Sequence, residues 1–355
     1  MKSIIQWLTL FVFAVSFPAR SLVVLQYHHI SDSTPASTSL SPELFKQHID
    51  YLKDNDFKVL ALSSVMAAIE KGESLPNKSV VITFDDGYRS VYTNAFPILK
   101  QYNFPFTVFV NTQPITQKLN QFMTWNELQE LIDAGADVGN HSVNHLHLIP
   151  QHFNDEASSK NKLVENEITR AQSTLEKNLS KVIKAFAYPY GEFNQQSKEI
   201  LKSLGFIAFG QHSGAFNMEG DLQQIPRFPF GGNYGDIKDF ALKINSLPMP
   251  IKAASLLDQT NIELYSHLLD QTHNMPKLKL TLEAALSGLN ITCFSSSGEE
   301  LKSEVGDKGS ITFSPSNPIS KGRSRYNCTA PSSQTKRYYW FSQPLIYPYD
   351  NGNYY

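Results

Sequence analysis

The first two-thirds of the sequence alternates short apolar runs with segments of helical periodicity. Strand-length apolar runs occupy residues 22–27, 80–84, 107–110, 136–139, 183–188 and 206–209, and helical spacing is found at 42–57, 65–69, 92–102, 126–134, 160–179 and 197–204. Strands that are joined through helices pair in parallel, with right-handed crossovers. About seven such units predict an α/β fold, either a barrel or an incomplete barrel.

The pattern changes after about residue 247. Residues 248–277 look irregular and predict a connector, whereas short alternating runs separated by Gly, Ser, Asn and Pro predict a small antiparallel β-sandwich at residues 278–355. In the run RYYWFSQPLIY, Trp340 and Ser342 alternate with Tyr339 and Phe341. Such alternation is typical of a packed strand, although the aromatic residues would also suit carbohydrate binding. We therefore expect an α/β domain at residues 22–247 and a sandwich beyond the connector.

The N-terminus predicts export. Lys2 precedes an apolar run at residues 4–17, which is short for a membrane span and suits a signal peptide at residues 1–21. An uncleaved anchor and a buried first element are the alternatives. No later segment is apolar enough to cross a membrane. Because of the predicted signal peptide, we expect a periplasmic or extracellular protein. In an exported chain, Cys293 and Cys328 are expected to form a disulfide bond.

The charge balance argues against nucleic acid as a partner. The 355 residues include 31 Lys and Arg and 33 Asp and Glu, a net charge of −2. Nucleic-acid-binding domains carry a basic excess, which is absent here.

Two adjacent carboxylates stand where a predicted strand ends. Asp85 and Asp86 follow the strand at residues 80–84 directly, and Gly87 permits a tight turn after them. Functional residues of α/β folds gather at the C-terminal ends of the strands. Two neighbouring carboxylates repel each other unless a positive charge lies beside them, and a divalent metal would supply that charge.

Two histidines follow another predicted strand end. His141 and His145 are four residues apart, so one helical turn would place both imidazoles on one side. Alone, this spacing is typical of a polar surface turn. Together with a carboxylate, two histidines suit a catalytic divalent metal with open positions for water and substrate. Zinc fits this set, and so do cobalt and nickel.

Three motifs in order resemble the polysaccharide deacetylase family, the carbohydrate esterases with a NodB homology domain. They are TFDDG at residues 83–87, HSVNH at 141–145 and PYG at 189–191. The resemblance covers about residues 22–235. The forms LQYHHI and AYPYGEF are most similar to the branch that includes the bacterial poly-N-acetylglucosamine deacetylases.

The resemblance implies a fold and a role for each motif residue. The fold would be a distorted, incomplete (β/α) barrel of the NodB type. Asp85 would be the general base, Asp86, His141 and His145 would bind the metal, and the Tyr190 backbone N–H would stabilise the oxyanion. Aromatic and imidazole side chains near the motifs are candidates for binding sugar rings. These candidates are Tyr88, Trp125, Tyr190 and His28.

The sequence departs from the family pattern in two places. Ala187 stands where relatives have the arginine that orients the base, and we expect Arg227, rather than Arg89, to replace that arginine. The histidine that acts as general acid in many relatives cannot be placed, and the protonated base could serve instead. The histidines considered for that role are His28, His29, His212, His267 and His273.

The resemblance implies hydrolysis of an acetyl group on a polysaccharide. The first hypothesis is N-deacetylation of an N-acetylglucosamine polymer of the poly-N-acetylglucosamine, chitin or peptidoglycan type, with release of acetate. An O-acetyl polysaccharide esterase on the same scaffold is the alternative, because the same site attacks both acyl groups. A carbohydrate-binding protein without turnover is a third, and the intact motif residues argue against it.

Overall fold

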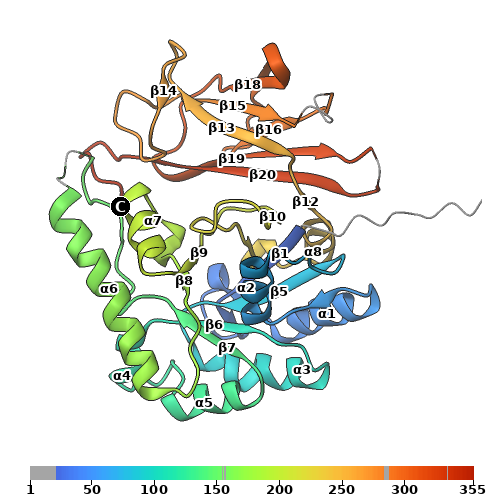
Figure 1. Ribbon diagram of the computed structural model, residues 1–355, viewed down its shortest axis with the longest axis vertical. Helices are drawn as coiled ribbons and strands as arrows, with labels where there is room; N and C mark the ends of the chain where they lie inside the picture. Colours follow the sequence, from blue (N-terminus) through green and yellow to red (C-terminus); the bar gives the residue numbers. More distant parts are fainter. Residues whose placement is uncertain (1–20, 154, 156, 284–287, 334) are drawn as a thin grey trace, which may run out of the picture.

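A computed structural model describes residues 21–355, except residues 154, 156, 284–287 and 334. The predicted signal peptide lies outside the described residues, apart from Ser21. In the described part, a curled sheet with its helices forms one unit, and two antiparallel sheets of the C-terminal segment lie against it (Figure 1).

The first unit is built on a mainly parallel sheet. Among the described residues, its strands follow the order β10-β1-β5-β6-β7-β8-β9, with β4 on β5 and β11 on β1. The bounds are β1 (Ser21–Tyr27), β4 (Lys58–Val59), β5 (Ser79–Phe84), β6 (Thr107–Val110), β7 (Asp137–Asn140), β8 (Ala185–Ala187), β9 (Ile207–Phe209), β10 (Phe216–Asn217) and β11 (Phe228–Pro229). The predicted parallel α/β architecture is confirmed.

The sheet is so strongly curled that residues 225–229 contact both its last strand, β9, and its first long strand, β1. Ile225 forms a bridge with Phe209 of β9, while β11 pairs with Leu25 and Gln26 of β1. Residues 225–229 thus lie between the last strand and the first, which makes the sheet an incomplete barrel as expected. This closure brings residue 227 beside the end of β5.

Helices cover the outer face of the curled sheet (Figure 1). The first of them begins as its sequence predicts, because the Ser41 side chain accepts a hydrogen bond from the Leu44 N–H and Pro42 occupies the first turn. The helices are α1 (Pro42–Asp54), α2 (Leu62–Lys71), α3 (Phe96–Gln101), α4 (Thr112–Thr116), α5 (Trp125–Asp133), α6 (Ala157–Asn178), α7 (Gln195–Ser203) and α8 (Ile237–Ile244), and a π-helical turn (Val91–Ala95) precedes α3.

One buried histidine of α1 makes folding sensitive to pH. His48 is fully buried against Phe240, its Nε2 lies 2.9 Å from the Gly235 carbonyl oxygen, and its Nδ1 lies 3.0 Å from the Tyr27 hydroxyl. A carbonyl only accepts, so Nε2 carries the proton and Nδ1 accepts from Tyr27. Burial lowers the pKa of His48 to about 4. The folded protein therefore keeps this imidazole neutral where the unfolded chain would protonate it.

We expect stability to fall on acidification because of this histidine. Below about pH 6.5 the unfolded state binds a proton that the folded state refuses, so His48 should remove about 2 kcal/mol of the free energy of unfolding between pH 7.5 and pH 5. Urea denaturation at both pH values measures the loss. His48→Gln keeps a donor and an acceptor but does not titrate, so its loss should be smaller by that amount. An identical loss in both proteins would contradict the prediction.

The second unit is a pair of mainly antiparallel sheets, as the C-terminal pattern predicts, and only the short strand β12 pairs in parallel, with β20, among the described residues. The sheets have the orders β12-β20-β19-β16 and β14-β13-β15-β18-β17. The strands are β12 (Leu247–Pro248), β13 (Ile251–Leu257), β14 (Glu263–Leu264), β15 (Lys277–Leu282), β16 (Thr292–Ser295), β17 (Lys302–Val305), β18 (Ser310–Ser314), β19 (Gly322–Pro331) and β20 (Tyr338–Tyr347).

The expectation of an irregular connector at residues 248–277 is wrong in structural terms. This segment supplies β13 and β14, and β13 pairs with β15 along its length. Only Leu256 of β13 is fully buried, and a register shift interrupts the pairing between Ile251 and Ala253. The alternation of apolar and polar residues that would reveal a strand is therefore missing from the sequence.

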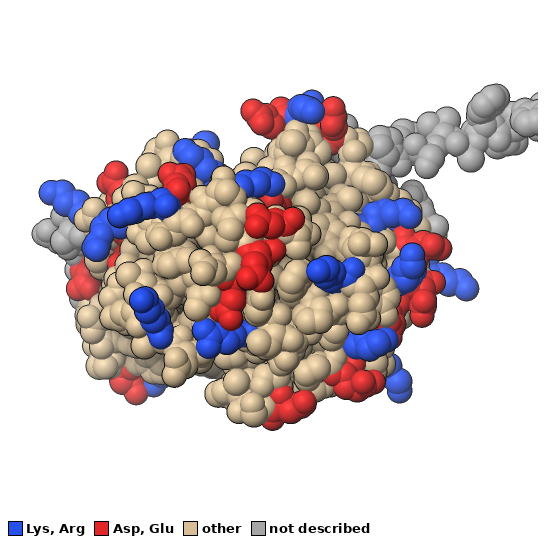
Figure 2. Space-filling model, turned by 90° about the horizontal axis from the view of Figure 1, so that it is seen from below, with Lys and Arg blue, Asp and Glu red and all other residues tan. Residues whose placement is uncertain are grey.

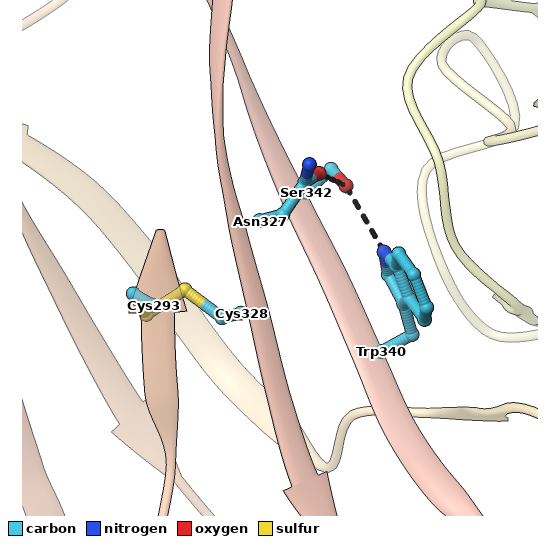
Figure 3. Close-up of a disulfide and its surroundings, with 5 residues drawn as sticks. All are labelled: Cys293, Asn327, Cys328, Trp340 and Ser342. Carbon is cyan, nitrogen blue, oxygen red and sulfur yellow. Dashed lines mark hydrogen bonds between the residues drawn. A yellow bond between two sulfur atoms is a disulfide. The ribbon is translucent and has the colours of Figure 1, made fainter. Parts of the chain in front are cut away.

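The two faces of the β19–β20 pair have different partners. Cys328 of β19 forms the predicted disulfide bond with Cys293 of β16, whereas Asn327, Ser342 and Trp340 project from the β19–β20 strands as a hydrogen-bonded group (Figure 3). Trp340 packs against the core of the first unit. Tyr339 and Phe341 pack against the core of the sandwich. The alternation in RYYWFSQPLIY therefore reflects packing on both faces.

The surface agrees with the neutral charge balance of the sequence. On the face seen from below, Lys and Arg side chains are interspersed with Asp and Glu (Figure 2). Within the described ranges, no helix has the length and apolarity that a bilayer crossing requires.

Candidate functional site

The two adjacent aspartates point to different partners because the chain turns between them. The Asp85 N–H still pairs with the Tyr27 carbonyl of β1, at 2.9 Å, so Asp85 continues the strand. Asp86 then adopts a left-handed conformation with φ of 74°, and Gly87 follows with φ of 80°. This turn separates two carboxylates that sequence alone places side by side.

Asp85 is held by a buried arginine. The two carboxylate oxygens each lie 2.7 Å from one terminal nitrogen of Arg227, and Gln26 Nε2 donates to Oδ2 at 2.7 Å. Both members of the ion pair are fully buried, and Arg227 is fixed further by the Gly210 carbonyl, 2.9 Å from its Nε. Burial alone would raise the pKa of Asp85, but Arg227 and His141 outweigh it and lower that pKa. Asp85 is therefore a preoriented, ionised carboxylate.

Arg227, rather than Arg89, contacts Asp85, as expected for the residue that replaces the arginine missing at position 187. It lies beside Asp85, whereas Arg89, the second candidate, lies near Glu127 with its Nε 3.4 Å from the carboxylate. Arg227 reaches Asp85 from the segment that closes the barrel.

Asp86 lies with two histidines in a group that could hold a metal ion. Its Oδ1 is 3.3 Å from His141 Nε2 and 3.4 Å from His145 Nε2, and one ligand atom from each residue lies within 4.8 Å of the others. The three residues therefore bring one carboxylate oxygen and two ring nitrogens together as a possible ligand set.

The donor atoms of this group fit a cation. His141 Nδ1 lies 2.7 Å from the Ala187 carbonyl oxygen, so Nδ1 carries the proton and Nε2 presents a lone pair. That Nε2 is buried and has no hydrogen-bond partner among the described residues. A lone pair that faces a carboxylate oxygen is repulsive unless a cation lies between them. Aspartate with two histidines matches catalytic sites of zinc and related metals.

A loop, and not the expected helical turn, brings the two histidines together. Ser142 and His145 have positive φ values of 69° and 55°. The Ser142 hydroxyl accepts from the His145 N–H at 3.0 Å, and the buried Glu167 carboxylate of α6 accepts from the N–H groups of residues 143–144 at 3.1 and 2.8 Å. The helical-turn expectation is therefore wrong, because side chains satisfy the backbone groups that a helix would pair internally.

The Pro189–Gly191 turn places Tyr190 beside the histidines. Tyr190 has φ of 59°, and its ring centroid is 4.5 Å from that of His145. Gly191 has φ of 71°, and a Cβ there would come within 2.5 Å of Gln211 Cβ. Glycine is thus required for the turn to approach the neighbouring chain.

The sequence did not predict three further residues that surround Tyr190. The His147 ring stacks on Tyr190 at 4.0 Å, and its Nδ1 lies 2.7 Å from Oε2 of the buried Glu192. Arg323 of β19 donates from Nη1 to the Tyr190 carbonyl oxygen at 2.6 Å. His147 and Glu192 adjoin the motifs in sequence, which is a weak indication that they lie at the site. Arg323 is 133 residues from Tyr190, and nothing in the sequence indicates that it lies there.

Two of the predicted sugar-contacting residues lie near the Asp86 group, and a third packs elsewhere. The Tyr88 ring stacks on His29 at 3.6 Å, and burial together with Asp86 raises its pKa. His28 is half-buried at the end of β1, close enough to influence the pKa of Asp86. Trp125 begins α5 and packs, partly buried, against the main core.

The remaining histidines considered for proton transfer lie apart from one another. His273 pairs with Asp270 in the second unit, with Nδ1 2.8 Å from the carboxylate. His212 and His267 line a cavity between the two units, next to Tyr190.

A family model and several curated proteins match the sequence of this chain. The model for polysaccharide deacetylase matches residues 72–209, which include all three motifs. The putative polysaccharide deacetylase YxkH of Bacillus subtilis is 28% identical over 192 residues, which span 53% of this chain and 63% of that protein. A Staphylococcus epidermidis poly-β-1,6-N-acetyl-D-glucosamine N-deacetylase is 29% identical over 60% of this chain and 80% of its own length. The Escherichia coli K12 protein of the same name is 25% identical over 64% of this chain and 39% of its own length.

Solved structures confirm the fold of the first unit. IcaB from Ammonifex degensii superposes with a TM-score of 0.55 and 27% identity, over 63% of this chain and 97% of that one. The Streptococcus pyogenes deacetylase PplD, in complex with acetate, superposes with a TM-score of 0.57 and 24% identity, over 64% and 99%. Both therefore correspond to little more than the first unit.

Proposed function

We propose that this chain is a metal-dependent N-deacetylase of polysaccharides, because residues 72–209 match the family model for polysaccharide deacetylase. Its substrate would be the N-acetylglucosamine units of an envelope or extracellular polymer, and its products acetate and a free amine. The observation that carries the proposal is the pairing of a preoriented carboxylate, Asp85 on Arg227, with the ligand set of Asp86, His141 and His145. The names of the relatives favour poly-β-1,6-N-acetylglucosamine over chitin or peptidoglycan.

The metal, for which zinc is the first choice and cobalt and nickel are alternatives, would be held by Asp86, His141 and His145. Bound there, such an ion polarises an acetyl carbonyl and lowers the pKa of water. Asp85 takes the proton of the attacking water, because Arg227 keeps it ionised and fixed in direction. The Tyr190 backbone N–H would donate to the oxyanion that forms on the acetyl oxygen. Asp85 would return its proton to the nitrogen as the bond between carbon and nitrogen breaks, so that the sugar leaves as a neutral amine.

We also propose that the chain acts after export, in the periplasm or outside the cell. The apolar N-terminal run supports this, and so does the Cys293–Cys328 disulfide bond. The α/β domain would end near residue 247. The second domain would begin with β13, because that strand pairs within the sandwich.

Removal of the metal tests the proposed function. We expect the mature protein to release acetate from β-1,6-linked N-acetylglucosamine oligomers, a chelator to abolish the release, and added zinc to restore it. Acetate assay and metal analysis of the same samples measure both properties, and chitin and peptidoglycan fragments compare the polymers. Metal-loaded protein that released acetate only from O-acetylated glycans would contradict N-deacetylation and identify an esterase.

A further inference from the structure

A cavity lies between the Tyr190 turn and the β19–β20 strands of the second unit. It has a volume of about 280 Å³. This volume is close to ~300 Å³, the lower end of the range for small-molecule sites, and corresponds to about one sugar unit. Its polar lining includes Tyr190, Gln211, His212, Ser324 and Arg325. We call it the interdomain cavity.

The interdomain cavity adjoins the candidate active site. Tyr190 lines the cavity with one side, while its ring lies 4.5 Å from that of His145, a proposed metal ligand. Arg323 also lines the cavity and binds the Tyr190 carbonyl oxygen at 2.6 Å, so the second unit fixes the wall that the two sites share. A polymer with one unit at the metal ligands would therefore place a neighbouring unit at the cavity.

The charge within the interdomain cavity is positive. Arg323 is offset by the Glu192 carboxylate, 3.7 Å from its Nε. Burial lowers the pKa of His212 to about 3 and that of His267 to about 4, so both rings are neutral near pH 7. Arg325 is half-buried, and in the described part of the chain no hydrogen bond or ion pair of its guanidinium is found. One guanidinium charge therefore stays unbalanced.

We propose that the interdomain cavity is a subsite for the sugar next to the one that loses its acetyl group, and that it rejects a neighbour with a free amine. This inference rests on the proposed function. The ammonium group of a glucosamine unit would be repelled by the unbalanced Arg325 charge. An N-acetylated unit is neutral and would not be repelled, and an acidic unit would be attracted to Arg325. Deacetylation would then leave free amines separated along the polymer.

The test compares tetrasaccharides that differ only in the neighbour of the acetylated target unit. We expect the wild-type kcat/KM to be about five- to tenfold higher with an N-acetylated neighbour than with a glucosamine, and at least as high with a uronic acid. Arg325→Gln should reduce this preference to less than twofold. Lys302→Gln, which removes the same charge from the exposed strand β17, should keep the full preference.

Binding separates this inference from the proposed function. The same tetrasaccharides are titrated by calorimetry into wild type and both variants with chelator present, so that no turnover occurs. An affinity preference that Arg325→Gln removes would support the subsite even if no acetate were ever released, in which case the proposed function alone would fail. Equal rates and affinities for both neighbours in the wild type, or an unchanged preference in Arg325→Gln, would overturn the inference.

Discussion

Replacing Asp85 by Asn is expected to lower kcat for acetate release about 10³-fold while the metal content stays at the wild-type level. Replacing Asp86 by Ala is expected to remove both activity and metal. The difference follows from the turn between the two residues. The Asp85 oxygens are engaged by Arg227 and Gln26, whereas Asp86 Oδ1 faces His141 and His145.

Metal analysis and acetate release on the same preparations test this division of roles. His141→Ala should behave as Asp86→Ala does, because it removes the buried Nε2 of the ligand set. Asp54→Asn, at an exposed position of α1, removes one carboxylate far from the strand end and should retain both properties. Full metal occupancy in His141→Ala would refute the assignment of the ligands, and loss of metal in Asp85→Asn would refute the division of roles.

The grouping of the motifs could be predicted because it depends on topology. Parallel strands end at the same edge of a sheet, so residues that follow β5, β7 and β8 must meet whatever their separation in sequence. The conformation of the connecting loops could not be predicted in this way. HSVNH has a helical spacing, yet Ser142 and Glu167 satisfy its backbone and make it a loop. Such competition by side chains is decided by tertiary contacts.

The contacts that cross between distant segments were the least predictable. Arg227 was one of two candidates for the missing arginine, and only the closure of the barrel by residues 225–229 places it 2.7 Å from Asp85, 142 positions away. Arg323 belongs to a strand whose pattern predicts packing and nothing more. Its contact with Tyr190 depends on how the sandwich docks, and no local spacing encodes that.

Arg227→Ala is expected to lower the free energy of unfolding by about 3–5 kcal/mol near pH 7 and to abolish acetate release. The variant would leave the Asp85 carboxylate fully buried without its cation, and the Gly210 carbonyl without the donor that Arg227 provides. Urea denaturation measures the stability. A double variant, Asp85→Asn with Arg227→Leu, removes both charges of this buried ion pair and should recover most of the lost stability but none of the activity.

The effect of pH on this variant has a definite sign. In the wild type the pKa of Asp85 is lowered, so its ion pair contributes stability above about pH 4 and loses that contribution as pH falls through the folded-state pKa. Without Arg227, burial would raise the pKa of Asp85, and the carboxyl would take up a proton more readily in the folded protein than in the unfolded chain. The stability difference between wild type and Arg227→Ala should therefore shrink as pH falls from 7 to 4. A difference that stayed constant over this range would show that the cost of the variant comes from lost packing and hydrogen bonds, and not from an unpaired buried charge.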